Sequence, residues 1–433
     1  MLCHDTLQPF TGGGATLSSL FSSFPRENLF SIHSDVCAPN ESRLAGSYRL
    51  SGYDLRYLQA IESTRWLIRT VRRLFPSETG GNGQVNEDQS GPTSSRLGLM
   101  DVLAHASYFR LKPQVLKAIA DFQPELLYAW IGDATWGRTM MNVVRRFRLP
   151  YVVHFMDNHI GLKPASGWKG MAKTALFKRQ VDRAVAGAAA IFAISDAMAA
   201  AYAARWKRRV LTFHGVMPTG CWSKTMPKRV NSVFELAFTG SIEHGQLVGL
   251  LDVAQAVEKV NQSGRRARLV LYITDYYRER VARHFASFQN SVVQPHPDAD
   301  SLAEALLRAD ALVLAYGFDQ LTQDYYRYSF ATKLVPYMLS KTPVIAYGPP
   351  SIAPIDYVLS GGWAMVVTEQ SVELLAESIK RLINDAGERA RFGLLAHEAA
   401  CREHDQTVVA GRFAEALAAV AKSRFTDKAE TNR

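Results

Sequence analysis

The chain has 433 residues, of which 47% are apolar and 21% are charged, as in ordinary globular proteins. This length favours two or three domains, and the composition excludes wholesale disorder, collagen-like chains and coiled-coil fibres. No uninterrupted apolar stretch reaches the ~18 residues of a membrane-spanning helix, and the first ten residues lack the pattern of a signal peptide. The four cysteines are scattered without a C-x-x-C pair, which predicts a cytoplasmic protein without structural zinc.

The net charge of +10 is distributed unevenly along the chain. Residues 1–230 contain 29 Lys and Arg against 16 Asp and Glu, whereas residues 231–433 contain 21 against 24. A basic first half suggests an anionic partner, for which nucleic acid, an acidic membrane surface and a phosphorylated substrate all qualify. Aromatic residues do not alternate with the basic ones as in platforms for single-stranded nucleic acid, so no nucleic-acid partner is expected.

One basic segment, RWLIRTVRRLF at residues 65–75, has the pattern of an amphipathic helix. Helical spacing places Arg65, Arg69, Arg72 and Arg73 on one face and apolar side chains on another. Such a helix can lie on an anionic membrane surface, where each cation contributes about 1 kcal/mol. A surface helix that packs its apolar face on its own domain has the same pattern, so both interpretations stand.

The first predicted elements form a series of strands and helices. Residues 77–96 are rich in Gly, Ser, Asn and Gln, which predicts a mobile surface loop. From Leu126 onward, apolar runs alternate with helix-period sequence, as in the βα units of a parallel sheet. Ser195 is expected to cap a helix. The strands predicted in this half span residues 126–131, 151–156, 190–194 and 210–213.

A linker rich in Pro and Gly separates this series from a second one. The second series has predicted strands at 234–238, 268–274, 311–315, 343–347 and 363–367, and helices at 246–261, 276–288, 332–339 and from 372 onward. The sequence therefore predicts an α/β fold of two doubly wound, Rossmann-like domains facing a cleft. The predicted boundaries are a first domain at 1–220, a linker at 221–231, a second domain at 232–405 and a last helix at 406–433.

Two glycine-containing segments suit the binding of an anion or a sugar. Gly12, Gly13 and Gly14 precede a helical pattern, where glycines let backbone N–H groups approach a ligand. A plain tight turn is the alternative, and the strand before this segment must be short or truncated, so the natural start could lie further upstream. Gly240 and Ser241 end the first strand of the second half, where the ligand crevice of a doubly wound sheet lies.

The segment YYRYSFATKLVPYMLSKTPVIAYGPP, residues 325–350, has the most specific pattern. Ser329 can cap a helix whose first turn holds Thr332 and Lys333. A helix N-terminus with free N–H groups and a nearby lysine predicts a diphosphate site. The alternative is a surface lysine on an ordinary helix.

With these segments in order, the chain resembles the GT-B glycosyltransferases, in particular the family-four group of retaining nucleotide-sugar enzymes. The resemblance covers most of the chain. It rests on GGGATLSSLFSSFP at 12–25, LPYVVHFMDNH at 149–159, AIFAISDAM at 190–198, FTGSIEHGQ at 238–246 and SFATKLVPYMLSKTPVIAYGPP at 329–350.

This resemblance implies an N-terminal acceptor domain, a C-terminal nucleotide-sugar domain and a last helix that crosses back to the first domain. The expected reaction moves a sugar from a nucleoside diphosphate sugar to a lipid-linked or saccharide acceptor, with retention and without cofactor or metal. Polysaccharide or cell-envelope synthesis is implied, in the cytoplasm or at the inner face of the plasma membrane.

The resemblance also assigns roles to individual residues. His154 matches the histidine that points at the transferred sugar, and Asp157 lies in the same loop; a core histidine with satisfied hydrogen bonds is the alternative for His154. Gly12–Gly14 match the acceptor-domain glycine loop. Gly240 and Ser241 match the loop under the diphosphate, while Ser329, Thr332 and Lys333 complete the donor site.

The chain also departs from this family's pattern. Ser241 and Gln246 stand where many members have Arg and Lys, and Tyr328 and Pro336 stand where many have a pair of glutamates. Lys333 is therefore expected to neutralise the leaving group. Two alternatives remain open: a nucleotide-sugar epimerase of the same fold, and a non-catalytic, membrane-docked partner of other glycosyltransferases.

Overall fold

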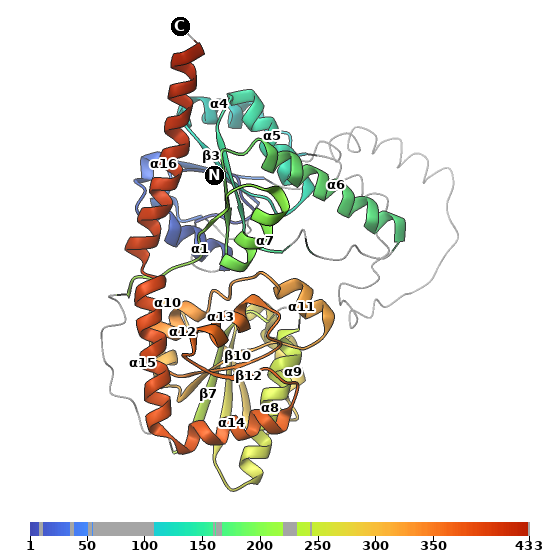
Figure 1. The fold of residues 1–433 in the computed structure, drawn as a ribbon, viewed down its shortest axis with the longest axis vertical. Coiled ribbons are helices and arrows are strands. Elements are labelled where there is room, and N and C mark those ends of the chain that lie inside the picture. The colour runs from blue at the N-terminus through green and yellow to red at the C-terminus, as the bar shows by residue number, and fades with distance from the viewer. Residues whose placement is uncertain are drawn as a thin grey trace, which may run out of the picture.

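The computed structural model describes residues 1–7, 12–34, 39–50, 54, 108–158, 161, 167–219, 232–242 and 245–431. The predicted amphipathic helix with Arg65, Arg69, Arg72 and Arg73 lies outside these residues, as do the predicted loop 77–96 and linker 221–231. The described chain forms two groups of parallel strands covered by helices, with the N-terminal group above the C-terminal one in Figure 1.

The N-terminal group contains two parallel sheets that are connected through one residue. Its strands are β1 (Phe30–His33), β2 (Gly46–Arg49), β3 (Leu127–Trp130), β4 (Tyr151–Phe155), β5 (Ala190–Ala193) and β6 (Leu211–Thr212). Four of them pair in the order β3-β4-β5-β6, and β1 pairs with β2. Leu2 bridges Ile32 of β1 and Ala129 of β3, so one buried residue connects the two sheets.

Helices cover these strands, and two of them begin at polar caps. The helices are α1 (Gly12–Leu20), α4 (Pro113–Phe122), α5 (Ala134–Phe147), α6 (Gly167–Ala186) and α7 (Asp196–Trp206), with short 3-10 turns at η1 (Arg26–Asn28) and η2 (Glu41–Arg43). The Asp133 carboxylate accepts the backbone N–H of Trp136 at 2.9 Å, and the Ser195 hydroxyl accepts that of Met198 at 3.1 Å. The predicted capping role of Ser195 is confirmed.

The C-terminal group contains a six-stranded parallel sheet in the order β12-β11-β10-β7-β8-β9. The strands are β7 (Phe234–Gly240), β8 (Ala267–Ile273), β9 (Ser291–Pro295), β10 (Ala311–Ala315), β11 (Val344–Tyr347) and β12 (Met365–Val367). Strand order reverses between β7 and β10, and ligands of doubly wound sheets bind at such a switch point. Every residue of β10 is buried, as expected for a central strand covered on both faces.

Helices pack on both faces of this sheet and form two separate apolar cores. One core includes side chains of α8 (Gln246–Gln262), α9 (Asp275–Phe285) and α14 (Val372–Asn384). The other includes side chains of α10 (Ala299–Arg308), α12 (Leu334–Leu339), α13 (Ala353–Gly361) and α15 (Ala386–Glu403). The predicted fold class, an α/β chain with two groups of helix-covered parallel strands, is confirmed. Within the described ranges no helix combines the length and hydropathy that crossing a membrane requires.

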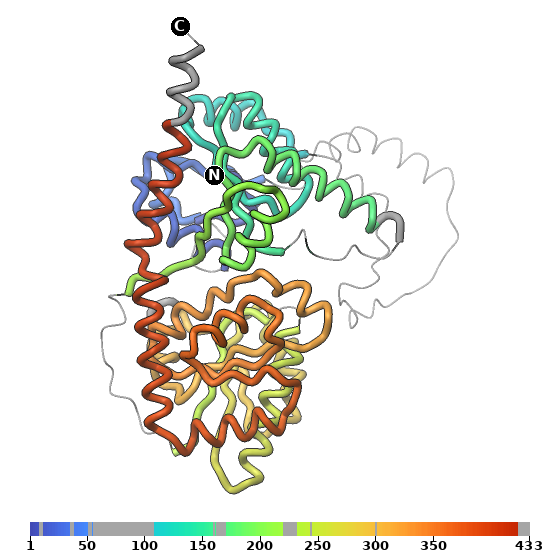
Figure 2. Tube along the Cα trace, viewed as in Figure 1, coloured from blue at the N-terminus to red at the C-terminus, as the bar shows by residue number. Residues whose placement is uncertain are grey.

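The last helix, α16 (Gln406–Thr431), leaves the C-terminal group and packs on the N-terminal one, as Figure 2 shows. Its Phe413 is fully buried among four N-terminal aromatic rings. The ring centroids lie 5.0 Å from Phe21, 5.3 Å from Phe213, and 5.8 Å from both Tyr128 and Phe192. These edge-on and tilted contacts make a residue near the end of the sequence part of the N-terminal core.

Candidate active site

A cavity of about 310 Å³ lies between the two groups of strands. It is lined from the N-terminal side by Asp5, Gly12, Gly13, Thr16, Trp130, Met156, Asp157 and Ile194, and from the C-terminal side by Ser241, Gln246, Tyr316, Tyr325, Tyr326, Ser329, Phe330, Ala331, Thr332 and Lys333. Most of the predicted site residues therefore meet at one cavity. Gly14, His154 and Gly240 do not line it.

The start of α1 forms the N-terminal wall of this cavity. A Cβ atom on Gly13 would come within 2.1 Å of the Asp5 carboxylate and 2.9 Å of the Trp130 ring, so only glycine fits without rearrangement. A Cβ atom on Gly12 would lie 3.6 Å from the Thr332 hydroxyl, so the two walls of the cavity lie close together at this point. Gly14 is buried inside the helix. Backbone N–H groups at this helix start can bind an anion or a sugar hydroxyl.

Lys333 brings a cation to the opposite wall. Its ammonium nitrogen lies 3.7 Å from the centre of the Phe238 ring, a cation–π contact at the end of β7. A Cβ atom on Gly240 would lie 3.7 Å from the same nitrogen. Gly240 has a φ of 112°, which favours glycine, and this turn directs the chain into Ser241 at the cavity. The positive charge of Lys333 also helps to lower the pKa of His296 at the end of β9, although burial is the larger cause.

The predicted cap of the Lys333 helix is wrong. The Ser329 hydroxyl donates to the carbonyl of Tyr325 at 3.2 Å, so it completes the end of α11 (Gln320–Tyr326) instead of starting α12. Helix α12 begins at Leu334, and Thr332 and Lys333 precede it. Lys333 reaches the cavity from this turn.

Two positions that depart from the family pattern are neutral at the cavity. Ser241 and Gln246 both line it. Gln246 is 6% exposed and its side chain is hydrogen-bonded to the hydroxyl of Tyr316. Burial raises the pKa of Tyr316, so this hydroxyl stays protonated at neutral pH. Lys333 is thus the only cationic side chain among the residues that line the cavity in the described ranges.

His154 does not line the cavity, so the structure gives no support to its predicted catalytic role. Its side chain is fully buried, with Nδ1 2.6 Å from the Tyr128 hydroxyl and its ring edge-on to Phe192. Burial lowers the pKa of His154 to about 3, so the imidazole is neutral at pH 7. Strand β4 continues one residue beyond it, and the residues that follow, Met156 and Asp157, line the cavity instead. His154 is thus a buried histidine, as in the alternative interpretation, but its Nε2 atom has no hydrogen-bond partner among the described residues.

The sequence analysis missed the aromatic side chains of the cavity. Trp130 is the last residue of β3, and Tyr325 and Tyr326 end α11 beside Phe330. Flat rings beside hydroxyl and carboxylate groups suit a carbohydrate, which presents both apolar faces and hydroxyls. Trp130 could have been found, because ligand-binding residues of such sheets gather at the carboxyl ends of strands.

A second polar cluster lies where the chain passes between the two groups of strands. His214 follows β6 and His404 ends α15, and their ring nitrogens are 2.6 Å apart. The Tyr357 hydroxyl is 2.7 Å from the other nitrogen of His404. Burial lowers the pKa of His214 to about 4 and that of His404 to about 3. Both imidazoles are therefore neutral at pH 7 and share one hydrogen bond.

This histidine pair should make the protein acid-sensitive. Because an unfolded histidine has a pKa of about 6.5, the unfolded chain binds protons first as the pH falls. The free energy of unfolding should therefore decrease by about 2 kcal/mol or more between pH 7 and pH 4.5. Urea titrations at several pH values measure this slope. It should become shallower in His404→Gln, whereas His284→Gln, a change at an exposed histidine, should keep the wild-type slope. Equal slopes in all three proteins would contradict the assignment of the acid sensitivity to this histidine pair.

Metal ligands are not grouped in the described ranges: no cluster of three or more His, Cys, Asp or Glu side chains is arranged to hold a metal ion there.

Comparison with known proteins identifies the fold. No family model and no curated protein sequence matches the chain. Among solved structures, Anabaena Alr3699/HepE in complex with UDP is similar at a TM-score of 0.61 and 13% identity, over 96% of this chain and 99% of that one. The OtsA apo structure is similar at 0.59 and 11% identity, over 96% and 98%. Sucrose-phosphate synthase (tll1590) from Thermosynechococcus elongatus follows at 0.56 and 13%, over 77% and 82%.

These structures are GT-B glycosyltransferases. Two of them match nearly the whole length of this chain. The chain therefore has the GT-B fold, as the order of its motifs predicted.

Proposed function

We propose that this protein is a glycosyltransferase that takes its sugar from a nucleoside diphosphate sugar. The observation that carries the proposal is the cavity itself, where Lys333 on the C-terminal wall faces the start of α1 and Asp157 on the N-terminal wall. Similar structures that contain UDP or UDP-glucose support a uridine nucleotide as the first donor to test.

Stabilisation of the leaving group is the proposed task of the C-terminal wall. Negative charge develops on the departing diphosphate in the transition state, and preorganised donors lower its energy. Lys333 supplies the cation, the turn at Gly240–Ser241 supplies backbone N–H groups, and the Thr332 and Ser329 hydroxyls add donors. No metal is required in this proposal, so a chelator should leave turnover unchanged.

Orientation of the sugars is the proposed task of the N-terminal wall. The Asp157 carboxylate can accept hydrogen bonds from sugar hydroxyls, and the backbone of Gly12 and Gly13 can approach the sugar closely. Trp130 offers an apolar face against which a sugar ring can pack. Holding donor and acceptor in one water-poor cavity aligns the reacting atoms, which accounts for much of the catalysis in such sites. Retention of the anomeric configuration remains part of the proposal.

A membrane-borne acceptor fits the charge of the N-terminal surface. Exposed basic side chains on and beside α5, α6 and α7 are Arg145, Arg146, Arg148, Arg179, Arg183, Arg205, Lys207 and Arg209. Cations on one domain attract anionic lipid headgroups or a phosphate-linked acceptor. We therefore place the protein, as a proposal, at the cytoplasmic face of the plasma membrane in polysaccharide or cell-envelope synthesis.

The uncharged side chains of Ser241 and Gln246 at the cavity support a second candidate, a non-catalytic partner of other glycosyltransferases. Nucleotide binding separates the two candidates. For a glycosyltransferase, one of UDP, GDP, CDP, ADP and dTDP should raise the unfolding midpoint by several degrees, because ligand at 100 times its Kd stabilises by about 2.7 kcal/mol. The matching nucleoside without phosphates is the control and should shift the midpoint far less. No shift with any nucleotide would favour the non-catalytic partner.

A further inference from the structure

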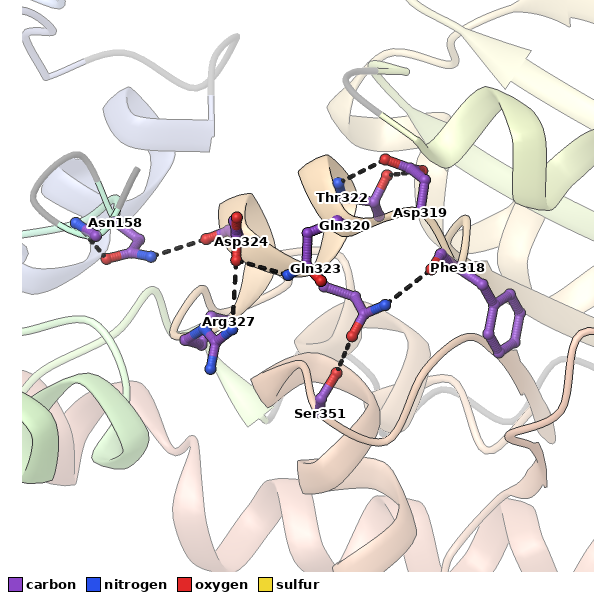
Figure 3. A network of polar contacts seen from close by, with 10 residues as sticks. Asn158, Phe318, Asp319, Gln320, Thr322, Gln323, Asp324, Arg327 and Ser351 are labelled. Atoms are coloured by element: carbon purple, nitrogen blue, oxygen red, sulfur yellow. Dashed lines mark hydrogen bonds and ion pairs between the residues drawn. The ribbon is translucent and has the colours of Figure 1, made fainter. Parts of the chain in front are cut away.

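Two polar side chains of the N-terminal group hold one segment of the C-terminal group across the domain boundary. The Asn158 side-chain amide donates to the backbone carbonyl of Asp324 at 2.8 Å, and the Ser195 hydroxyl donates to that of Tyr328 at 2.6 Å. Asn158 follows β4 and Ser195 follows β5, so the carboxyl ends of two neighbouring strands contact points four residues apart. Figure 3 shows the Asn158 contact reaching α11.

The next strand of the same sheet makes a third contact. His214, which follows β6, stacks on Phe330 with the ring centroids 4.7 Å apart and an angle of 29° between the rings. Three successive strand ends thus contact residues 324, 328 and 330 in chain order. The segment continues through Ala331 and Thr332 to Lys333, and all of residues 329–333 line the cavity.

The beginning of this segment is fixed to its own domain. Asp319 caps α11 by accepting the backbone N–H of Thr322 at 2.9 Å. The Gln323 side chain donates to the carbonyl of Phe318 at 2.8 Å and accepts from the Ser351 hydroxyl at 2.7 Å (Figure 3). The end of the segment is also tied to its own domain, because the backbone N–H of Ala353 donates to the carbonyl of Arg327 at 3.2 Å and the Asp324 carboxylate accepts from Gln320 at 2.9 Å. The backbone carbonyls of Asp324 and Tyr328, in contrast, accept from the side chains of the N-terminal group.

We infer that these three N-terminal side chains are positioning residues: they add to the contacts that segment 324–330 makes within its own domain and bring Lys333 to its position at the leaving group when the two domains are apposed. The inference rests on the proposed function and extends it. Misplacement of a catalytic group by about 1 Å can cost about 100-fold in rate. Loss of one of these contacts should therefore lower kcat by about 10- to 100-fold and change the KM for the donor little.

Two substitutions remove the cross-domain donor and keep the local hydrogen bond. Asn158→Asp retains the oxygen that accepts the backbone N–H of Gly161 at 3.2 Å, and Ser195→Asp retains a good helix cap for Met198. Each places an oxygen without a proton opposite a carbonyl. Ser351→Ala is the matched control, because it breaks a contact between Gln323 of α11 and its own domain.

The first measurement needs no activity: the rate of reductive methylation of Lys333, followed by peptide mass spectrometry. It should rise several-fold in Asn158→Asp and Ser195→Asp and stay at the wild-type rate in Ser351→Ala, with circular dichroism confirming that all are folded. Unchanged methylation in both aspartate variants would overturn the inference. A wild-type protein that turns over no nucleotide sugar would defeat the proposed function and leave this measurement intact.

Kinetics supply the second measurement once a donor is found. In a Lys333→Ala background the Asn158→Asp change should have no further effect on kcat, because it acts through the missing lysine. If Asn158 had a purely structural role, the losses of kcat caused by the two substitutions would multiply, and that outcome would refute the positioning role.

Discussion

Replacing Lys333 by methionine should lower kcat for sugar transfer by about 100- to 1,000-fold, the usual cost of removing one group that stabilises transition-state charge. Methionine keeps an unbranched apolar stem of similar length on the Phe238 ring, so the protein should remain folded. Among the cavity side chains of the described ranges no other is cationic, and the neighbouring Ser241 and Gln246 cannot compensate. Release of the nucleoside diphosphate from the donor sugar measures the rate.

Lys380→Met is the control for this prediction. Lys380 lies on α14 in the same domain, where it forms an ion pair with Glu377 at 2.9 Å. It does not line the cavity. Surface pairs of this kind contribute little, so kcat should stay at the wild-type value. A Lys333→Met protein that retains normal kcat would remove the lysine from the reaction and require another group to stabilise the leaving diphosphate.

Replacing Phe413 by alanine should lower the free energy of unfolding by about 3–5 kcal/mol, the usual cost of deleting a buried phenyl ring. The ring is fully buried and contacts four other aromatic rings, so the vacated space cannot close easily. Urea unfolding followed by fluorescence measures the loss. If the two domains unfold in separate transitions, the loss of stability should appear in the transition of the N-terminal domain, although Phe413 follows the C-terminal sheet in sequence.

Val408→Ala tests the same helix at a position that is 56% exposed. Its effect should stay within about 0.5 kcal/mol, as for most surface substitutions. Similar losses in both variants would mean that α16 contributes through its helical structure and not through the packing of Phe413.

Much of the fold could be predicted because its central strands are buried on both faces. Strands such as β5 and β10 are continuous apolar runs, and the sequence placed both within one residue. Strand β9 was missed because it is an edge strand whose residues are partly or largely exposed. Leu2 was also missed as a sheet residue, since a single bridge has no periodicity.

From the sequence, only those site residues could be predicted that directly follow a predicted strand. Asp157 and Ser241 follow strands, and both line the cavity. His154 was misassigned because β4 runs one residue further than the histidine, which leaves its side chain in the core. The contacts of Asn158 and Ser195 with backbone carbonyls could not be predicted, because they depend on how two separately folded sheets are placed.

The return of α16 to the N-terminal sheet has a consequence for synthesis on the ribosome. Chains emerge N-terminus first, and N-terminal domains usually fold before the rest is made. Here the pocket among Phe21, Tyr128, Phe192 and Phe213 stays empty until Phe413 emerges, after the whole C-terminal sheet. The C-terminal domain, whose described strands all precede that point, can complete its sheet first. The half of the protein translated first is therefore expected to reach its native packing after the second half, and nascent chains should expose its aromatic core to chaperones until Phe413 has emerged.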